Sequence, residues 1–542
     1  MRFILIATGA FFAASLAVSA AELLPAETPV NVAIDFYVNQ RLEQEEVTPA
    51  QLVGDENLIR RLTLDLAGRI PTLAETQAYV RSQTPQKWTL LADRLLESPD
   101  YGYHHRNELD VMLLAGKKND NEWREYLLKA AAENRRWDNL FREMMIGSEE
   151  KPDQKPALTF LKLRAKSIDD LTNDTSRIFF GINVSCAKCH DHPLVEDWKQ
   201  DHYYGMSSFF SRTYLTKKNT LAEKYSGSVK FKTTAGVEKQ AKFMFLTGSS
   251  ISEPAGKKTK EQRKAEDAEV KRQMKDDKAP PPKPPEFSPR AKLVELALRS
   301  GENRFFARNI VNRLWARMLG RGIVDPLDQL HSENYPSHPE LLDWLERDFI
   351  AHNFDMKRIL RGIALSNTYA RSSRWDGDSE VPDDDYFAVA MTRALSPRQY
   401  ALSLNVACAS PASFPLNPKP KDWSKRRKDL ENASAGLAGL FEIPGEHFQV
   451  GVDEALLFSN SEQIQNDILR DSGDRLVGYL KKINDPRKLI ERAFWIVFSR
   501  APDAKETQAL ESFLAKRTKN RVSGIQQLAW ALITSPEVRF NY

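Results

Sequence analysis

The chain has 542 residues, of which 41% are hydrophobic and 28% are charged. This balance is typical of a folded protein and excludes a disordered one, and the length predicts two or three domains. The net charge is only +4, from 78 basic and 74 acidic residues, which does not favour nucleic acid as a partner.

The first residues have the order of a secretory signal peptide. Arg2 gives a positive start, an apolar run reaches Val18, and small residues continue to Ala21. This order predicts that residues 1–21 are cleaved and that the mature protein is periplasmic or secreted. No later stretch approaches about 20 apolar residues, so we expect no transmembrane anchor in the mature chain.

The next part of the chain, residues 30–250, is expected to form a helical domain. Apolar residues recur at helical spacing, for example at Leu58, Leu62 and Leu66. Thr72 followed by Glu75 predicts a capping box at a helix start. Residues 228–246 alternate between polar and apolar, which predicts a small β-hairpin inserted in this domain.

Residues 251–290 are expected to form an exposed linker between the halves. They are rich in charge and include the proline-rich run 280–285. Such a composition does not bury a core, and the prolines favour a stiff extended end.

A second helical domain is expected over residues 291–542. Apolar residues between Phe305 and Met318 predict a helix that ends at Gly320. Two further helix starts are predicted by capping boxes, and one polar stripe on the first helix is expected to face the other domain. The boxes are Ser337 with Glu340 and Asp503 with Glu506, and the stripe is Arg308, Asn309, Asn312 and Arg313. The expected fold is therefore mainly α, with two helical domains, a hairpin insertion and a charged, proline-rich linker.

The cysteines give the strongest chemical signal. Only Cys186, Cys189 and Cys408 occur, whereas a secreted scaffold held by disulfides carries more cysteines in even number. His190 follows Cys189 directly, which completes a Cys-x-x-Cys-His motif. We expect Cys408 to be buried and unpaired.

This motif is typical of covalent haem c attachment. Cys186 and Cys189 can form thioether bonds to the porphyrin while His190 ligates the iron. Residues three apart lie on one helical face, which brings both sulfurs to one porphyrin edge. Export fits this interpretation, since c-type haem is attached outside the cytoplasm. Candidates for a further ligand are His202 and Met206, and also His192, which lies too close in sequence to reach the opposite haem face easily.

Other interpretations of the motif remain open. The two cysteines with His190, His192 and His202 could bind zinc and stabilise a structural or interaction protein of the envelope. The thiols could also close a local disulfide or stay unreactive beside a helix cap. A metal-assisted hydrolase would further need an open coordination position and a nearby Glu or Asp base. The sequence leaves open whether the protein is an enzyme.

Side chains around the motif allow two readings each. Aromatic residues after the motif could line a haem or form an ordinary core: Trp198, Tyr203, Tyr204, Phe209 and Phe210. Asp191 and Asp197 could orient the histidines or cap helices. The remaining candidates are more typical of surface or packing histidines, although each could complete a site in three dimensions: His104, His105, His331 and His338.

Longer motifs resemble those of a two-domain family of planctomycetes and their relatives. In these proteins a cytochrome c-like domain of unknown function (family 1549) precedes a planctomycete-specific domain (family 1553). The first domain is similar over 60–72, 180–181, 186–193, Trp198, 203–204 and 209–210. The second is similar over 309–315, 320–326, 336–342, 366–369 and 535–537.

The resemblance implies a haem-binding first domain, chiefly through the family label. The family motif also includes His192 and Pro193, which simple haem attachment does not require, so zinc or another metal stays open. Relatives often occur beside secreted sulfatase-like and polysaccharide-degrading proteins, which implies a role alongside those systems. The resulting hypothesis is an exported c-type haem protein in electron transfer or haem-dependent redox chemistry, with an unidentified redox or envelope protein as partner.

Overall fold

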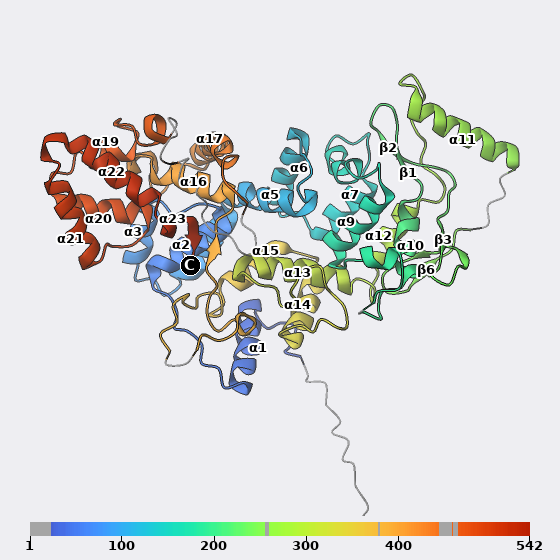
Figure 1. Cartoon of the computed structure of the whole chain (residues 1–542), viewed down its shortest axis with the longest axis horizontal. Helices are drawn as coiled ribbons and strands as arrows, with labels where there is room; N and C mark the ends of the chain where they lie inside the picture. Colours follow the sequence, from blue (N-terminus) through green and yellow to red (C-terminus); the bar gives the residue numbers. More distant parts are fainter. Residues whose placement is uncertain (1–22, 194, 255–258, 378–379, 444–457, 459–463) are drawn as a thin grey trace, which may run out of the picture.

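The structure, a computed structural model, describes residues 23–193, 195–254, 259–377, 380–443, 458 and 464–542. Over these residues the chain is mainly helical, and its strands form only two-stranded sheets (Figure 1). The predicted fold class is therefore confirmed. No helix in this part of the chain is long and apolar enough to cross a membrane. The predicted signal peptide lies outside the described residues.

The first helical part leads from the N-terminal side to the cysteine motif. Its helices are α1 (Val30–Gln44), α2 (Asp55–Ala67), α3 (Leu73–Arg81), α4 (Lys87–Glu97), α5 (Pro99–Leu114), α6 (Asn121–Ala132), α7 (Trp137–Ile146), η1 (Lys155–Leu158), α8 (Thr159–Lys162), α9 (Ile168–Phe180), η2 (Ser185–Lys188) and α10 (Gln200–Phe210). The predicted capping box is present at α3, where the Glu75 amide donates to Thr72 Oγ1 (3.2 Å) and the Thr72 amide donates to Glu75 Oε2 (2.8 Å). This box satisfies two amides that the first turn leaves without helical partners.

The second helical part begins after the charged segment. Its helices are α12 (Pro289–Ala297), α13 (Arg304–Leu319), α14 (Pro339–Ala351), α15 (Met356–Ala364), η3 (Asp384–Tyr386), α16 (Pro397–Ala407), η4 (Pro411–Ser413), α17 (Pro420–Ala438), η5 (Ile464–Ile468), α19 (Leu476–Leu480), α20 (Pro486–Val497), α21 (Ala504–Ala515), η6 (Thr518–Asn520), α22 (Arg521–Ile533) and α23 (Pro536–Arg539). As predicted, α13 ends at Gly320 in the left-handed conformation (φ 96°) and α21 begins with the Asp503–Glu506 box.

One predicted helix start is wrong in detail. Helix α14 has His338 as its N-cap residue, and no side chain caps it. The Ser337 amide instead donates to the Ile323 carbonyl (2.8 Å), and Ser337 Oγ hydrogen-bonds His338 Nδ1 (3.0 Å). The amide and the hydroxyl of Ser337 therefore form other hydrogen bonds, and the predicted capping box is absent.

One hydrophobic core crosses the two predicted domains. It extends from Val30 to Ala388 and includes residues from α1, α9, α13 and α15. Helix α1 packs against α14 and α15, and a Cβ added at Gly362 would lie only 2.2 Å from Val30 Cγ1. The charged segment is thus not a boundary between separate cores.

A second core is formed by the helices after residue 395. These helices, drawn in orange and red, gather at one end of the molecule, with α2 and α3 beside them (Figure 1). Leu64, Ile70 and Leu73 contribute to this core from the N-terminal part. Cys408 is fully buried in it, as predicted, and burial raises the pKa of its thiol to about 12.

Three of the four described strand pairs lie at the other end of the first core (Figure 1), and the fourth, which contains the last strand, contacts α2. They are β1 (Thr213–Leu215) with β2 (Leu221–Glu223), β3 (Lys230–Lys232) with β4 (Glu238–Gln240), β5 (Phe243–Met244) with β6 (Ser250–Ile251), and β7 (Arg393–Ala394) with β8 (Phe540–Asn541). All four pairs are antiparallel. The predicted hairpin is β3–β4, with Lys230 opposite Gln240, and the pairs on either side of it were not predicted.

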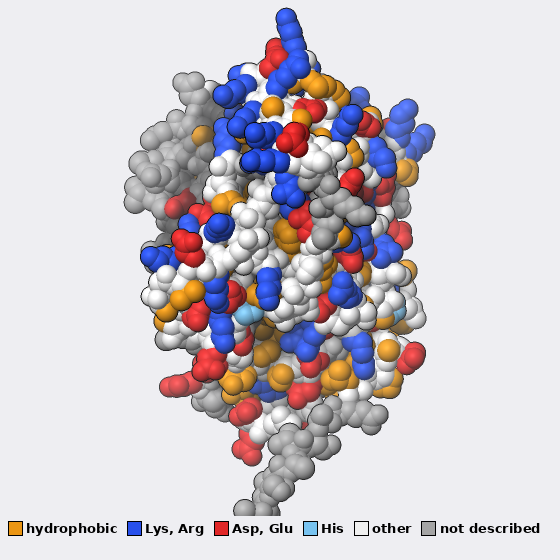
Figure 2. All heavy atoms as spheres, turned by 90° about the vertical axis from the view of Figure 1, so that its right-hand side faces the viewer, with side chains coloured by type: hydrophobic (Ala, Val, Ile, Leu, Met, Phe, Trp, Pro, Cys, Tyr) orange, Lys and Arg blue, Asp and Glu red, His pale blue; other side chains and the backbone are white. Residues whose placement is uncertain are grey.

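The charged segment contains a helix, α11 (Lys260–Lys275), that the linker prediction did not include. Most of α11 is exposed, but Val270 packs in a small cluster with Tyr214 and Ala222 of the first hairpin. Lys, Arg, Asp and Glu side chains are interspersed on this end of the molecule, which Figure 2 views face on. The segment is therefore an exposed helical appendage. It is attached through Val270 and through the buried Gln273, which accepts hydrogen bonds from Tyr214 Oη and the Lys217 amide.

A buried ionic cluster joins α2 to the end of the chain. Asp65 is 5% exposed and pairs with the Arg393 guanidinium at 2.7 and 2.9 Å. The same carboxylate accepts from Tyr369 Oη (2.7 Å) and Asn541 Nδ2 (2.9 Å). Burial lowers the pKa of Arg393, but Asp65 outweighs it and the pKa is raised overall. This carboxylate holds together parts of the chain that are far apart in sequence.

Candidate cofactor site

The segment that leads into the cysteine motif is fixed by the second helical part. Helix α9 ends at Gly181, which has a left-handed backbone (φ 68°). The Leu330 amide donates to the Gly181 carbonyl and the Asn183 amide donates to the Asp328 carbonyl, both at 3.0 Å. These bonds pair residues 181–183 with residues 328–330, so the motif begins from a rigid support.

The two motif cysteines lie on the surface of a short 3₁₀ turn, η2. Cys186 and Cys189 are both exposed and carry free thiols, whereas Ala187 between them is buried in the core. Side chains three residues apart align along one side of a 3₁₀ turn. The turn therefore buries Ala187 and presents both sulfurs to solvent.

His190 has the tautomer that metal ligation needs. Its ring is exposed, and Nδ1 donates a hydrogen bond to the Asp191 carbonyl (2.7 Å). With the proton on Nδ1, the Nε2 lone pair of the neutral imidazole is available for a metal. A ligating histidine is commonly oriented by such a bond to a backbone carbonyl.

Helix α10 holds the motif through its backbone carbonyls. Gln200 Nε2 donates to the carbonyls of Lys188 (3.3 Å) and Cys189 (3.2 Å), and Tyr204 Oη donates to Lys188 (3.0 Å). Lys188 itself pairs with Asp169 of α9 at 2.6 Å. Of these side chains, only Tyr204 was considered for the site, as a residue that could line a haem. The others were not predicted, and only their short distance from the motif in sequence could have indicated them.

Two family models match the chain. A model of a protein of unknown function (DUF1549), named PSCyt2, matches residues 33–214, and one of a protein of unknown function (DUF1553), named PSD1, matches residues 289–427. The chain is a PSCyt2–PSD1 protein. The first name suggests a planctomycete cytochrome-like domain. No curated protein and no solved structure gives a significant match.

The predicted further ligands within PSCyt2 differ in their availability. His202 is half-buried, and its Nδ1 accepts from the Lys199 amide (3.1 Å), so the neutral ring carries its proton on Nε2. Burial lowers the pKa of this imidazole. Met206 is fully buried in the core, and its thioether would reach a metal at the surface only if α10 moved. His192 is half-buried, and its amide donates to the Trp198 carbonyl (2.7 Å).

A structural zinc site needs four ligand side chains close together. Within the described ranges, no three His, Cys, Asp or Glu side chains are grouped so that they could hold a metal ion. Asp191 accepts from the Gln200 amide (2.8 Å) at the start of α10, which is the capping role considered for it. Asp197 accepts from both the amide and the hydroxyl of Ser332 (2.8 and 3.1 Å), and so connects PSCyt2 to PSD1.

The aromatic residues after the motif mostly belong to the core. Trp198, Tyr203, Phe209 and Phe210 are each at most 3% exposed and lie in the large hydrophobic cluster. Tyr204 is half-buried and stacks on Phe231 (centroids 4.1 Å apart). The ordinary-core interpretation is therefore the one that these contacts support.

The polar stripe of α13 faces PSCyt2, as expected. Asn309 Nδ2 donates to the Ile178 carbonyl (2.7 Å) and Arg313 donates to the Arg177 carbonyl (2.9 Å), both at the C-terminal end of α9. These bonds satisfy carbonyls in the last turn of α9, and the Arg177 carbonyl also accepts from the Gly181 amide (3.2 Å). Elsewhere on the stripe, the Asn312 side chain hydrogen-bonds both the amide and the carbonyl of Val324. Arg308 forms ion pairs with Asp343 and Glu346 of α14.

The histidines outside the motif are chiefly packing residues. His104 and His105 are 4% and 2% exposed, and His338 is 3% exposed. Burial lowers the pKa of all three imidazoles, that of His338 to about 3. His331 is half-buried, and its Nε2 hydrogen-bonds Gln329 Oε1 (3.0 Å).

Acid is expected to destabilise the fold through these histidines. The pKa of His338 is lower in the folded chain than the ordinary value of about 6.5, so the unfolded chain takes up the proton first as the pH falls. The contribution of His338 to the free energy of unfolding is complete above about pH 6.5. It declines as the pH falls toward 3, by at most about 1.4 kcal/mol per pH unit. Urea unfolding at a series of pH values should show a shallower acid slope for His338→Asn than for wild type.

Val237→Asn is the control for this measurement, because Val237 is 57% exposed and carries no ionisable group. Its unfolding free energy should keep the wild-type slope. An unchanged slope in His338→Asn would contradict the assignment.

Proposed function

We propose that this PSCyt2–PSD1 protein is an exported c-type haem protein that transfers electrons to or from a partner protein. The observation that carries the proposal is the pair of free, exposed thiols of Cys186 and Cys189 on one side of a short turn, directly followed by His190. Attachment of each vinyl group requires a free thiol, and the motif offers two. A bound iron porphyrin supplies one-electron redox chemistry.

Several residues would bind the haem or hold the motif in place. Cys186 and Cys189 anchor the group covalently, and His190 offers Nε2 because Asp191 holds the proton at Nδ1. Gln200 and Tyr204 fix the backbone carbonyls of the motif, which keeps the three groups together. Because both thiols are at the surface, a group attached to them is open to a partner protein.

The test is expression of the full chain in the periplasm together with a haem-maturation system. The purified protein should gain the mass of one haem, keep it after denaturation and show a Soret band. The Cys186→Ala/Cys189→Ala double variant should lose all covalent haem, while His190→Ala should keep the mass and change the spectrum of the iron.

Cys408→Ala is the matched control, because it removes the third cysteine without touching the motif. It should keep the full haem content. Colourless wild-type protein with free thiols would contradict the proposal, and one zinc per chain without a Soret band would support the zinc-bound structural protein instead.

A further inference from the structure

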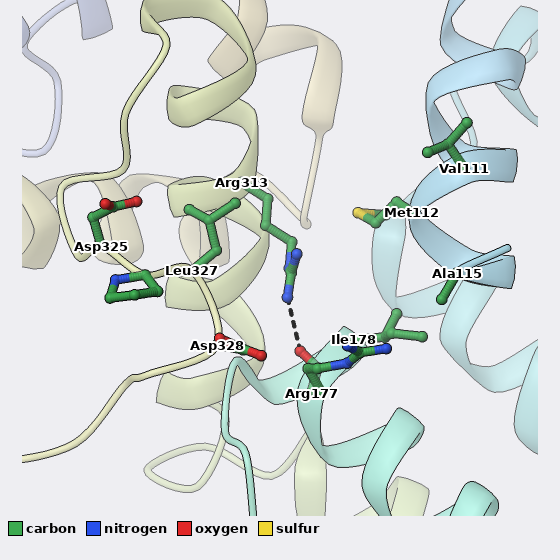
Figure 3. A pocket seen from close by; sticks show the side chains of 10 residues that line it. Val111, Met112, Ala115, Arg177, Ile178, Arg313, Asp325, Leu327 and Asp328 are labelled. Atoms are coloured by element: carbon green, nitrogen blue, oxygen red, sulfur yellow. Dashed lines mark hydrogen bonds between the residues drawn. The ribbon is translucent and has the colours of Figure 1, made fainter. Parts of the chain in front are cut away.

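A cleft lies where PSCyt2 and PSD1 meet, apart from the cysteine motif. Its volume is about 430 Å³, which is within the range of small-molecule sites. The lining comes from α5, α9, α13 and the loop 325–328 (Figure 3). In Figure 3 the Arg313 guanidinium points at the backbone carbonyl of Arg177, to which it donates a hydrogen bond, and the Arg177 side chain extends toward Ile178.

Arg313 is a half-buried cation without an ion pair in the described part of the chain. Its guanidinium donates to the Arg177 carbonyl and to Asn309 Oδ1, both at 2.9 Å and both neutral acceptors. Burial lowers the pKa of this guanidinium to about 10, and the nearby charge of Arg177 lowers it further while Asp328 opposes the shift. A half-buried charge that lacks a counter-ion can pair with an anionic ligand through charge-assisted hydrogen bonds.

Arg177 adds a second guanidinium, which is partly exposed and forms an ion pair with Asp174. Its side chain is 42% exposed and lies 3.5 Å from Asp174. Arginine presents several donors in a planar fork that matches a carboxylate. Two such forks around one cleft make a site for a carboxylate rather than for a neutral molecule.

The rest of the lining specifies the body of the ligand. Asp325 and Asp328 contribute carboxylates at one side, and neither forms an ion pair with a described residue. These oxygens can accept from hydroxyl or ammonium groups. Val111, Met112 and Ile178 form an apolar wall, on which Val111 is 69% exposed. The lining thus suits an anionic head, hydrogen-bond donors and a small apolar surface.

We propose that this cleft binds a small organic carboxylate that also carries hydroxyl or ammonium groups. Arg313 and Arg177 hold the carboxylate, and Asp328 accepts hydrogen bonds from the donor groups. The site is independent of the cysteine motif, so the proposal does not depend on haem.

Calorimetry on the full mature chain tests the proposal with defined probes. Gluconate represents the hydroxy acids and β-alanine the amino acids, and glucitol is the neutral counterpart of gluconate. At least one of the two acids should bind, and glucitol should bind at least 10-fold more weakly than gluconate if gluconate is the ligand. Arg177→Gln should weaken binding about 10-fold, equivalent to about 1.4 kcal/mol, and added salt should weaken it as well.

Arg142→Gln is the matched control, because Arg142 is an exposed arginine of α7 outside the cleft. It should bind like wild type, and circular dichroism should show all variants folded. Asp328→Asn should weaken binding. Tighter binding to Asp328→Asn would overturn the role of the donor groups, and absent binding, or binding that Arg177→Gln and Arg313→Gln leave unchanged, would overturn the site.

Discussion

Replacing Asp65 by asparagine should lower the free energy of unfolding by about 3–5 kcal/mol, because Arg393 then stays buried without its counter-charge. Asparagine has nearly the same shape, so the change removes charge without opening a cavity. It also leaves Tyr369 and Asn541 without the carboxylate that now accepts their hydrogen bonds. Equilibrium unfolding in urea, monitored by circular dichroism, measures the loss.

Asp93→Asn is the control for this prediction. Asp93 also pairs with an arginine, Arg361, but both side chains are well exposed (38% and 45%). Exposed ion pairs contribute about 0–1 kcal/mol, so this variant should unfold almost like wild type. Equal losses in the two variants would show that burial of the Asp65 cluster adds nothing.

Replacing Gly181 by alanine should cost roughly 2–5 kcal/mol of unfolding free energy and should also disturb the cysteine motif. About 1–2 kcal/mol comes from the left-handed backbone. A further 1–3 kcal/mol is the usual cost of overpacking, since the new Cβ would lie 2.6 Å from Leu330 Cδ1 and 2.8 Å from Asn309 Oδ1. Urea unfolding gives the loss, and thiol labelling of Cys186 and Cys189 reports the motif.

Gly116→Ala separates the two contributions. Gly116 also has a positive φ (83°), but nothing lies within 4 Å of the position that its Cβ would take. This variant should lose only the part of the unfolding free energy that comes from the left-handed backbone. It should leave the labelling rates of Cys186 and Cys189 unchanged. If Gly181→Ala lost no more stability than Gly116→Ala, the close contact with Leu330 would be absent in solution.

Features that depend on neighbours in sequence were predicted well. The Thr72–Glu75 box, the end of α13 at Gly320 and the hairpin at 228–246 each need only a few adjacent residues. The Ser337–Glu340 box has the same local pattern, yet it does not form. There, the amide of Ser337 hydrogen-bonds Ile323 and its hydroxyl hydrogen-bonds His338. No local pattern predicts those contacts.

The candidate site was predicted only in its covalent part. The spacing of Cys186, Cys189 and His190 identified the motif, but the bonds that hold it come from Gln200 and Tyr204. Burial of Trp198 and Met206 in the core likewise depends on how α10 packs. Sequence alone shows an aromatic residue near a motif, and it does not show which way the side chain points.

Because the core from Val30 to Ala388 is shared, we do not expect a fragment that carries only the cysteine motif to fold. A fragment cut at the charged segment would leave the apolar faces of α1 and α9 open to water, because their partners in α13–α15 would be missing. Such a fragment should aggregate rather than fold. During synthesis or export, the N-terminal half likewise cannot complete this core until the chain up to about residue 388 is available.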